Sequence, residues 1–325
     1  MRDAAIDFTA DAPITGDLAA RWNHGSRSVR HNTDPPIQVH AYDEHTFVLR
    51  QNKAVHYEAP FLYLFCGNDR ALLLDTGATE DPGRFPLRDT VDTLLQGWLA
   101  EHPRAAYELI VAHTHGHSDH VAGDAQFDGR PSTTVVPADL ASVRSFFGVT
   151  DWPVDIVRLD LGGRVLEVTG CPGHHKASIA VYDPWTGFLV TGDTVYPGRL
   201  YVNDVAAFQE SLDRMVAFTQ SRPVTHIMGC HIEMSRRPRR DYPIGATYQP
   251  AEPPLQMTVA QLTAIRDAAK VVADRPGVHV FDDFIIFHGP CRRAMPRYAV
   301  RRLWSRLRSR IADYGQARPT EGDPP

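Results

Sequence analysis

The sequence lacks long hydrophobic runs and has few cysteines. No stretch approaches the roughly 18 consecutive apolar residues of a transmembrane helix, and the first thirty residues hold no apolar core typical of a signal peptide. The four cysteines are scattered without CxxC pairing, so neither a disulfide framework nor a zinc-finger spacing emerges. We therefore expect a cytoplasmic protein with reduced thiols and no membrane span.

The chain also lacks a strong excess of either charge. Its formal net charge of -5 gives no global cationic field, which disfavours a nucleic-acid partner. With 325 residues and 43% hydrophobic content it can bury one large core. We expect an N-terminal extension over 1–36, one catalytic domain over 37–290, and a basic helix followed by a disordered tail over 291–325.

Four side chains able to bind metal lie within six residues, directly after the apolar run Leu109–Val111. They form the hexapeptide His115-Gly-His117-Ser-Asp119-His120. Alternation along an extended backbone points the first three one way, while His120 can turn toward a second centre. Imidazole and carboxylate suit zinc best, although iron and manganese accept the same ligand types. This layout predicts a two-metal site, against the alternative of a polar loop with exposed histidines.

A dinuclear site needs further ligands, and three candidates each border a stretch that is typical of a strand. They are His174 in Cys-Pro-Gly-His, Asp193 in Thr-Gly-Asp-Thr and His231 in Gly-Cys-His. Strand ends direct all three toward one edge of the fold. A fourth acidic residue, Asp75, ends the apolar run Leu72–Leu74 and is followed by Thr-Gly.

The ordered set HxHxDH, PGH, GD and a late histidine resembles the metallo-β-lactamase fold superfamily of metallohydrolases, over roughly Val39 to His288. The resemblance implies an α/β fold, a four-layer αββα sandwich. It implies two metal ions, the first held by His115, His117 and His174, the second by Asp119, His120 and His231, with Asp193 bridging both. It also implies that Asp75 lies beneath the metal loop and holds a ligand imidazole by its free N–H.

Zinc-binding β-lactamases usually lack the bridging aspartate, whereas glyoxalase II-like hydrolases, lactonases and tRNA-processing nucleases keep it. Asp193 and His120 place this chain with the latter group. One departure is Cys230, where relatives often carry glycine. Because adjacent side chains on an extended segment diverge, we interpret Cys230 as a buried thiol and not as a ligand.

The chemistry expected of such a site is hydrolysis. Two divalent cations about 3.5–4 Å apart share a water and lower its pKa toward neutrality, which yields a bridging hydroxide as the nucleophile. Asp119 would carry the proton to the leaving group. Tyr196, three residues after Asp193, lies where some related lactonases place a phenol that binds the substrate carbonyl. The alternative for Tyr196 is a side chain packed on the loop.

Two basic stretches are candidates for further roles. Arg239 and Arg240, in a run that follows His231, would form a rim attracting a carboxylate, phosphate or glutathione-like substrate. The alternative is a solvated loop. The second stretch, Arg292 to Arg310, carries the helical stripe of Val300, Leu303, Trp304, Leu307 and Ile311. A membrane surface or nucleic acid suits such a helix, but we favour packing on the body or on a partner subunit, so homo-oligomerisation stays open.

Hydrophobic periodicity predicts alternating strands and helices, and hence two sheets covered by helices. The predicted strands are Val39–Leu49, Phe61–Phe65, Leu72–Leu74, Thr133–Val136, Arg164–Val168, Ile179–Val181, Phe188–Val190, Thr225–Met228 and Val278–Phe287. The predicted helices are Pro86–Glu101, Ala138–Phe147, Val205–Gln220 and Val259–Val272.

Three functions remain compatible with this site. The favoured one is a zinc-dependent hydrolase of a small ester, lactone, thioester or amide, in which hydroxyacylglutathione-type thioesters and lactones rank first. A metal-dependent phosphodiesterase or nuclease uses the same ligands for in-line displacement. An iron-dependent oxygenase on the same scaffold is the third.

Overall fold

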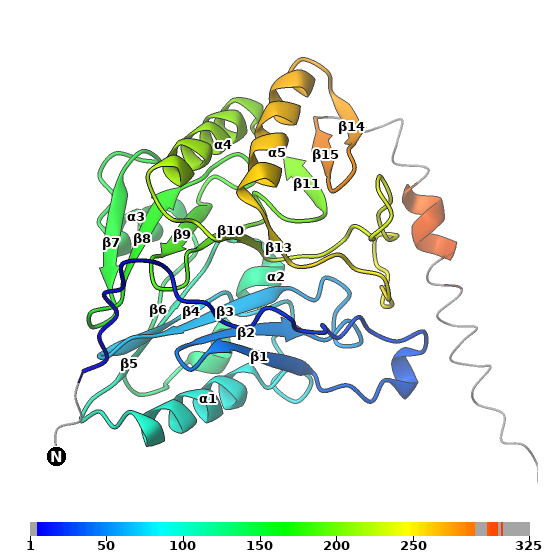
Figure 1. Ribbon diagram of the computed structural model, residues 1–325. Helices are drawn as coiled ribbons and strands as arrows, with labels where there is room; N and C mark the ends of the chain where they lie inside the picture. The colour runs from blue at the N-terminus through cyan, green and yellow to red at the C-terminus, as the bar shows by residue number, and fades with distance from the viewer. Residues whose placement is uncertain (1–4, 290–297, 305–306, 308–325) are drawn as a thin grey trace, which may run out of the picture.

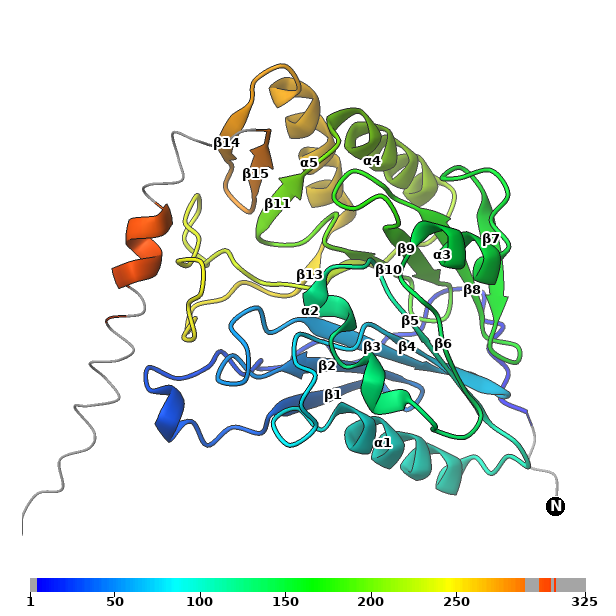
Figure 2. The same ribbon diagram turned by 180° about the vertical axis from the view of Figure 1, so that it is seen from behind.

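Two six-stranded mixed sheets pack face to face, with helices on both outer sides (Figure 1). The computed structural model describes residues 5–289, 298–304 and 307. Helix α1 covers the first sheet, and helices α4 and α5 lie over the second, as the view from behind also shows (Figure 2). This arrangement confirms the predicted four-layer αββα sandwich.

The first sheet has the strand order β1-β2-β3-β4-β5-β6. Strands β1 to β4 pair antiparallel, and β4, β5 and β6 pair parallel. Its elements are β1 Ile37–Asp43, β2 Thr46–Gln51, β3 Phe61–Cys66, β4 Arg70–Leu74, β5 Glu108–Ala112, β6 Thr133–Val135 and the covering helix α1 Leu87–Glu101. The parallel pairs place the carboxyl ends of β4 and β5 at the same edge, where the metal-loop motif begins.

The second sheet has the order β13-β12-β10-β9-β8-β7. Only β10 and β12 pair parallel. Its elements are β7 Ile156–Asp160, β8 Val165–Gly170, β9 Ile179–Asp183, β10 Phe188–Gly192, β12 His226–Gly229, β13 Gln256–Met257, α4 Val205–Gln220 and α5 Val259–Val272. The carboxyl ends of β10 and β12 deliver Asp193 and His231 to one edge.

A third, separate sheet of three strands, which was not predicted, lies beside α5 (Figure 1). It has the order β11-β15-β14, formed by β11 Arg199–Val202, β15 Ile285–His288 and β14 Gly277–Val280. The remaining short elements are α2 Ser118–Val121, α3 Leu140–Phe147, and the 3₁₀ helices η1 Val29–His31 and η2 Asp124–Phe127.

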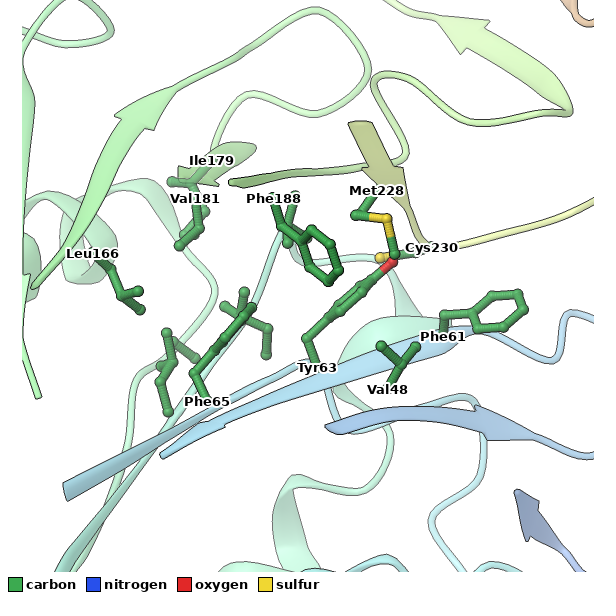
Figure 3. Packing of buried hydrophobic residues seen from close by; sticks show 14 of the residues in the cluster. Val48, Phe61, Tyr63, Phe65, Leu166, Ile179, Val181, Phe188, Met228 and Cys230 are labelled. Atoms are coloured by element: carbon green, nitrogen blue, oxygen red, sulfur yellow. The ribbon is translucent and has the colours of Figure 1, made fainter. Parts of the chain in front are cut away.

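Strand β3 shows how the sequence produces the layers. Successive side chains of a strand point to opposite faces. Phe61, Tyr63 and Phe65 face the second sheet, whereas Leu62 and Leu64 belong to the cluster under α1. In the inter-sheet core, Tyr63 and Phe65 approach Phe188, Val181 and Met228 (Figure 3). Both faces of β3 are therefore buried, which explains its continuous apolar sequence.

Several predicted elements are confirmed, and two are corrected. Helices α4 and α5 have the predicted bounds; Asp204 caps the first, and a capping box of Thr258 and Gln261 starts the second. The single strands predicted over Val39–Leu49 and Val278–Phe287 are hairpins. In the first hairpin the Asp43 carboxylate accepts the His45 N–H and closes the turn.

The predicted domain boundaries stay predictions, and the two termini contribute differently to the fold. Ile14, Leu18 and Trp22 of the N-terminal extension pack against the inter-sheet core. Of the predicted C-terminal helix, residues 298–304 and 307 are helical, and the predicted tail from 308 onward lies outside the described residues. No helix in the described part of the chain has both the length and the hydropathy needed to span a bilayer.

Buried Arg164 connects the two large sheets, and its loss is expected to destabilise the fold. Its Nη2 lies 2.6 Å from the Asp183 carboxylate, and Nη1 donates to the carbonyls of His45 and Cys66. The Arg164→Ala variant leaves Asp183 buried without its cation, so we expect a loss of about 3–5 kcal/mol in the free energy of unfolding. Denaturant unfolding measures this loss. Arg158→Ala, at an exposed position on β7, is the control, and equal stability of both variants would contradict this role of Arg164.

Candidate metal centre

The hexapeptide lies between β5 and the start of α2. Strand β5 ends at Ala112, and α2 begins at Ser118, so His115 and His117 occupy the connecting loop while Asp119 and His120 lie in the helix. His115 and His120 are buried, whereas His117 and Asp119 are partly exposed. The loop therefore presents a buried floor and an accessible rim.

Three histidines form the first cluster. His117 Nδ1 lies 2.9 Å from His115 Nε2 and 3.0 Å from His174 Nε2. The outer nitrogen of His174, Nδ1, lies 2.8 Å from the Tyr201 carbonyl. Because a carbonyl only accepts, that nitrogen carries the proton, and the Nε2 lone pair of His174 points into the cluster. Nitrogens in such close contact need a shared cation or a proton between them.

Asp119, His120, Asp193 and His231 form the second cluster. His120 Nε2 and His231 Nε2 are 3.4 Å apart, and His231 Nε2 lies 3.4 Å from Asp119 Oδ2. Their outer nitrogens are again held by acceptors. His120 Nδ1 lies 2.8 Å from Asp75 Oδ2, and His231 Nδ1 lies 3.2 Å from the Glu58 carbonyl. Both Nε2 lone pairs are thereby directed inward.

Asp193 stands between the two clusters. Its Oδ1 lies 3.5 Å from His120 Nε2 and 3.3 Å from His231 Nε2, while its Oδ2 lies 3.8 Å from His174 Nε2. Oδ1 is buried and makes no hydrogen bond within the described part of the chain. A buried carboxylate oxygen without a partner is costly. This donor set fits two cations that share Asp193.

The pKa values of the imidazoles and carboxylates in the second cluster also fit bound cations. Burial would lower the pKa of His231, but the Asp193 and Asp119 carboxylates outweigh it and raise that pKa to about 9. Burial also lowers the pKa of His120, but the Asp75 and Asp193 carboxylates outweigh it and raise that pKa well above its usual range. Burial raises the pKa of Asp193, yet His231 and His120 bring it to about 2. Without a metal, protons on the imidazoles balance the carboxylates; a metal cation takes the place of those protons.

The structure shows the contact that the predicted role of Asp75 requires. Besides binding His120, its Oδ1 accepts the Thr114 backbone N–H at 2.7 Å, and its Oδ2 accepts the Thr114 hydroxyl at 2.8 Å. The backbone of Asp75 has φ 69°, a left-handed conformation that aspartate tolerates better than most residues. Asp75 therefore fixes the orientation of the His120 ring and the start of the metal loop together.

Three residues that support this loop were not predicted. His113 Nε2 lies 2.8 Å from Asp124 Oδ1, and His113 Nδ1 lies 3.1 Å from the Val136 carbonyl oxygen. Thr76 donates its hydroxyl to the same Asp124 oxygen at 2.6 Å. These contacts tie the loop to β4 and to the end of β6. The available signal was a histidine two residues before the motif and an aspartate four residues after it.

His175 is a further unpredicted neighbour of the first cluster. Its ring centroid lies 5.1 Å from that of His117 and 5.8 Å from that of His115. Burial, and then the nearby histidines His117 and His174, lower the pKa of His175 to about 4. It is therefore a neutral ring at the edge of the cluster and adds no positive charge.

The structure places the Tyr196 hydroxyl in a buried network. Tyr196 is buried, and its hydroxyl donates to the Arg199 carbonyl and lies 3.2 Å from Glu233 Oε2. The ring packs against His231 at 5.6 Å, with the hydroxyl bound inside this network. Arg199 in turn pairs with Glu233 and with Asp241. These contacts fit the alternative of a packed tyrosine, and a substrate contact of the phenol stays a prediction.

Arg239 and Arg240 are exposed on the loop that follows His231. The Arg239 N–H donates to the Asp282 carbonyl, and the Arg240 carbonyl accepts the Ser235 N–H. The first bond ties the loop to the turn between β14 and β15, and the second closes the loop on itself. Their role as a substrate rim stays a prediction.

The buried thiols are expected to be unreactive in the native protein. Cys66, Cys171 and Cys230 are free and fully buried. Burial raises the pKa of Cys66 and of Cys171 to about 12, and it raises that of Cys230 above its usual range. Because the thiolate is the reactive form, a thiol reagent at pH 8 should label none of them until denaturant is added. Cys291→Ser removes the thiol outside the described residues, and rapid native labelling of that variant would contradict this expectation.

Comparison with known proteins identifies the family. The model of the Metallo-beta-lactamase superfamily matches residues 59–225, more than half of the chain. This chain belongs to the metallo-β-lactamase superfamily. The match contains His115, His117, Asp119, His120 and His174 in one segment, together with Asp193. The two clusters are consistent with a dinuclear metal site of this superfamily.

Among curated proteins the chain is similar to a hydroxyacylglutathione hydrolase and to an acyl-coenzyme A thioesterase. It is 33% identical over 128 residues to a hydroxyacylglutathione hydrolase of Pseudomonas aeruginosa PAO1, covering 38% of this chain and 48% of that protein. It is 28% identical over 170 residues to the human acyl-coenzyme A thioesterase MBLAC2, covering 43% and 59%. The chain thus spans about half the length of these relatives.

Solved structures of metallo-β-lactamases are also similar to this chain. TMB-1 superposes with a TM-score of 0.49 at 15% identity, over 74% of this chain and 100% of TMB-1. DIM-1 metallo-β-lactamase gives a TM-score of 0.48 at 12% identity, over 73% and 99%.

Proposed function

We propose that this chain is a dinuclear-metal hydrolase, with zinc as the metal, that uses water to cleave a small thioester. The wider class comprises esters, lactones, thioesters and amides. The observation that supports it best is the position of Asp193, whose two carboxylate oxygens face separate clusters of inward-directed imidazole lone pairs. That donor set suits zinc, which prefers imidazole and carboxylate ligands.

Two metal ions, when bound there, lower the pKa of a water and polarise the scissile carbonyl. The chain supplies the other functions. His115, His117 and His174 would hold one ion, and Asp119, His120 and His231 the other, with Asp193 shared. Because Asp75, Tyr201 and Glu58 bind the outer imidazole nitrogens, the rings keep their orientation during turnover.

Asp119 is the carboxylate placed to move a proton. Its side chain is 21% exposed, compared with 8% for Asp193, so it borders the accessible side of the cluster. Burial raises the pKa of Asp119, but the hydrogen bond with His231 and the charge of His120 have the larger, opposite effect. The net result is a lowered pKa, so Asp119 is ionised. In hydrolysis, water adds to the acyl carbon, the carbon–sulfur bond breaks, and Asp119 passes the proton from water to the leaving thiolate.

The described site offers no thiol nucleophile of its own. Cys230 adjoins His231, yet its Sγ lies 3.3 Å from Asp75 Oδ2 on the buried side, and burial keeps it protonated. Water is therefore the nucleophile in this proposal. The preference for thioesters over the other acyl compounds rests on the names of the two similar proteins, hydroxyacylglutathione hydrolase and acyl-coenzyme A thioesterase.

A substrate panel tests the proposal. The zinc-loaded full chain is assayed with lactoylglutathione, an acyl-coenzyme A, an acyl-homoserine lactone, a β-lactam and a phosphodiester. We expect kcat/KM for a thioester to exceed that for the phosphodiester and the β-lactam at least about 100-fold, a difference of about 2.7 kcal/mol in transition-state stabilisation. Turnover of the phosphodiester alone would contradict the proposal, and lactone turnover alone would contradict the thioester preference.

The proposed rim of Arg239 and Arg240 predicts a charge-dependent effect. Exposed charges act weakly and are screened, so the double variant Arg239→Ser/Arg240→Ser should raise KM for an anionic thioester about threefold to tenfold at low salt. KM for a neutral thioester and both kcat values should stay unchanged. Arg158→Ser, an arginine on β7, is the matched control. Equal KM values for the anionic substrate would contradict the rim.

A further inference from the structure

The described C-terminal helix, residues 298–304 and 307, exposes an apolar stripe. Val300 is 54% exposed, Leu303 and Trp304 are each 60% exposed, and Leu307 is 40% exposed. Their spacing of three, four and seven residues places them on one face of a helix. We call these four residues the C-terminal stripe. Both ribbon views show the helix at the side of the sandwich, next to the loop that contains Asp241 (Figures 1 and 2).

The opposite face of this helix is attached to the body. Arg301 Nη1 lies 2.7 Å from Asp241 Oδ1, and its Nη2 donates to the Asp241 carbonyl at 2.6 Å. The Tyr298 ring packs on the Phe287 ring with centroids 5.2 Å apart, and Tyr298 is only 8% exposed. Because these contacts orient the helix, the C-terminal stripe faces outward instead of into the core.

The stripe differs from the other exposed apolar side chains. Val271 on α5 is 64% exposed but stands alone on its helix, as scattered surface residues commonly do. Four large apolar residues on two helical turns instead form a contiguous surface. Such surfaces mark sites that bind another molecule or a membrane.

Charge identifies the kind of partner. The sequence from 292 to 310 contains eight arginines and no acidic residue, although the whole chain carries a net charge of -5. A second copy of this helix, packed face to face, would bring a like-charged segment alongside. A nucleic acid would match the charge and leave the stripe exposed. An anionic lipid surface matches both, because the apolar side chains enter the interface while the positive charge of the segment attracts anionic headgroups.

We propose that the C-terminal stripe docks this protein on an anionic lipid surface, with the helix lying in the interface. Leu303 and Trp304 are its most exposed members and enter the lipid first. The helix is peripheral, since none in the described part of the chain spans a bilayer. Apolar burial and headgroup attraction together give binding that either contribution alone leaves weak.

The Arg302 side chain passes beside Gly245, so the helix also lies next to the segment between Asp241 and β13. This inference stands independently of the proposed hydrolase function.

Vesicle co-sedimentation of the full chain tests the proposal. We expect binding to vesicles of phosphatidylcholine and phosphatidylglycerol in equal amounts, weaker binding to phosphatidylcholine alone, and a decrease with added salt. The double variant Leu303→Ser/Trp304→Ser should lower the partition coefficient at least about tenfold, because two large apolar side chains leave the interface. Val271→Ser is the matched control and should bind like the unchanged protein.

Two further measurements keep the test decisive. Trp304→Phe keeps an apolar ring and should bind, but it should lose the blue shift of tryptophan fluorescence that accompanies docking of the unchanged chain. Light scattering after size exclusion shows whether the stripe instead joins two copies. The proposal is overturned by absent binding to anionic vesicles, by unchanged binding of the double variant, or by a dimer that this variant dissociates.

Discussion

The Asp193→Ala variant is expected to lose kcat/KM by on the order of 10³-fold, the size of loss that follows removal of one stabilising group from a preorganised site. Both clusters depend on this residue, because Oδ1 faces His120 and His231 while Oδ2 faces His174. Its removal leaves two groups of imidazoles without their shared carboxylate. We therefore expect the variant to retain at most one of the two metal ions under dilute metal.

Two controls separate this effect from misfolding. Asp193→Asn keeps the shape of the side chain and removes its charge, and we expect nearly the same loss of activity with native circular dichroism. Asp213→Ala changes a half-exposed aspartate of α4, which pairs with Lys270 and Arg266, and should retain full activity. Full activity of Asp193→Ala would exclude a shared carboxylate from the mechanism.

Asp75→Asn is expected to lower metal affinity or kcat/KM about 10-fold to 100-fold, the range found when a residue that orients a metal ligand is replaced. The asparagine oxygen can still accept the Thr114 N–H, and asparagine tolerates the left-handed backbone at this position. Its amide presents a donor where the carboxylate accepted from His120 Nδ1. The His120 ring then loses the contact that keeps Nε2 unprotonated and directed inward.

This variant separates positioning from stability. We expect the melting temperature of metal-free Asp75→Asn to stay close to that of the unchanged chain, while the metal dissociation constant rises. Asp75→Ala also removes the acceptor for Thr114, so it should lose about 1–3 kcal/mol of stability in addition. Calorimetric titration with zinc and thermal unfolding measure the two quantities. A fall in stability alone, with unchanged zinc affinity, would show that Asp75 acts only on the fold.

Local chemistry explains which parts of the site could be predicted from the sequence. The hexapeptide is dense in possible ligands and follows an apolar strand, so neighbouring residues alone mark it, although Asp119 and His120 lie in helix α2 and not on an extended backbone. His174, Asp193 and His231 were predicted as ligands because each borders a predicted strand. The structure brings all of them within the two clusters at one edge of the sheets. The periodicity that predicted α4 and α5 is equally local, and both helices have the predicted bounds.

Features that depend on long-range contacts were missed. The Tyr196 hydroxyl is directed by Arg199 and Glu233, and Glu233 is 37 residues away in sequence. The pairing of His113 with Asp124 depends on how the loop folds back after α2. The third sheet pairs β11 with β15 across more than eighty residues. No spacing rule in the sequence predicts such pairs, because the fold of the intervening chain determines which residues come together.

The two hairpins were missed for a different reason. Val39–Leu49 and Val278–Phe287 were each predicted as one strand because their turns are short and polar positions alternate through them. In the structure Asp43 closes the first turn, and Phe281 and Phe284 stack across the second. Turns of this kind carry weak signals when neither glycine nor proline marks them.

The metal stoichiometry of the purified chain tests the central claim most directly. Protein freed of metal by chelation is titrated with zinc while bound zinc and thioester hydrolysis are followed together. We expect two zinc ions per chain, no turnover before metal is added, and full activity when both sites are filled. Turnover in fully chelated protein, or saturation at one zinc per chain with full activity, would contradict it.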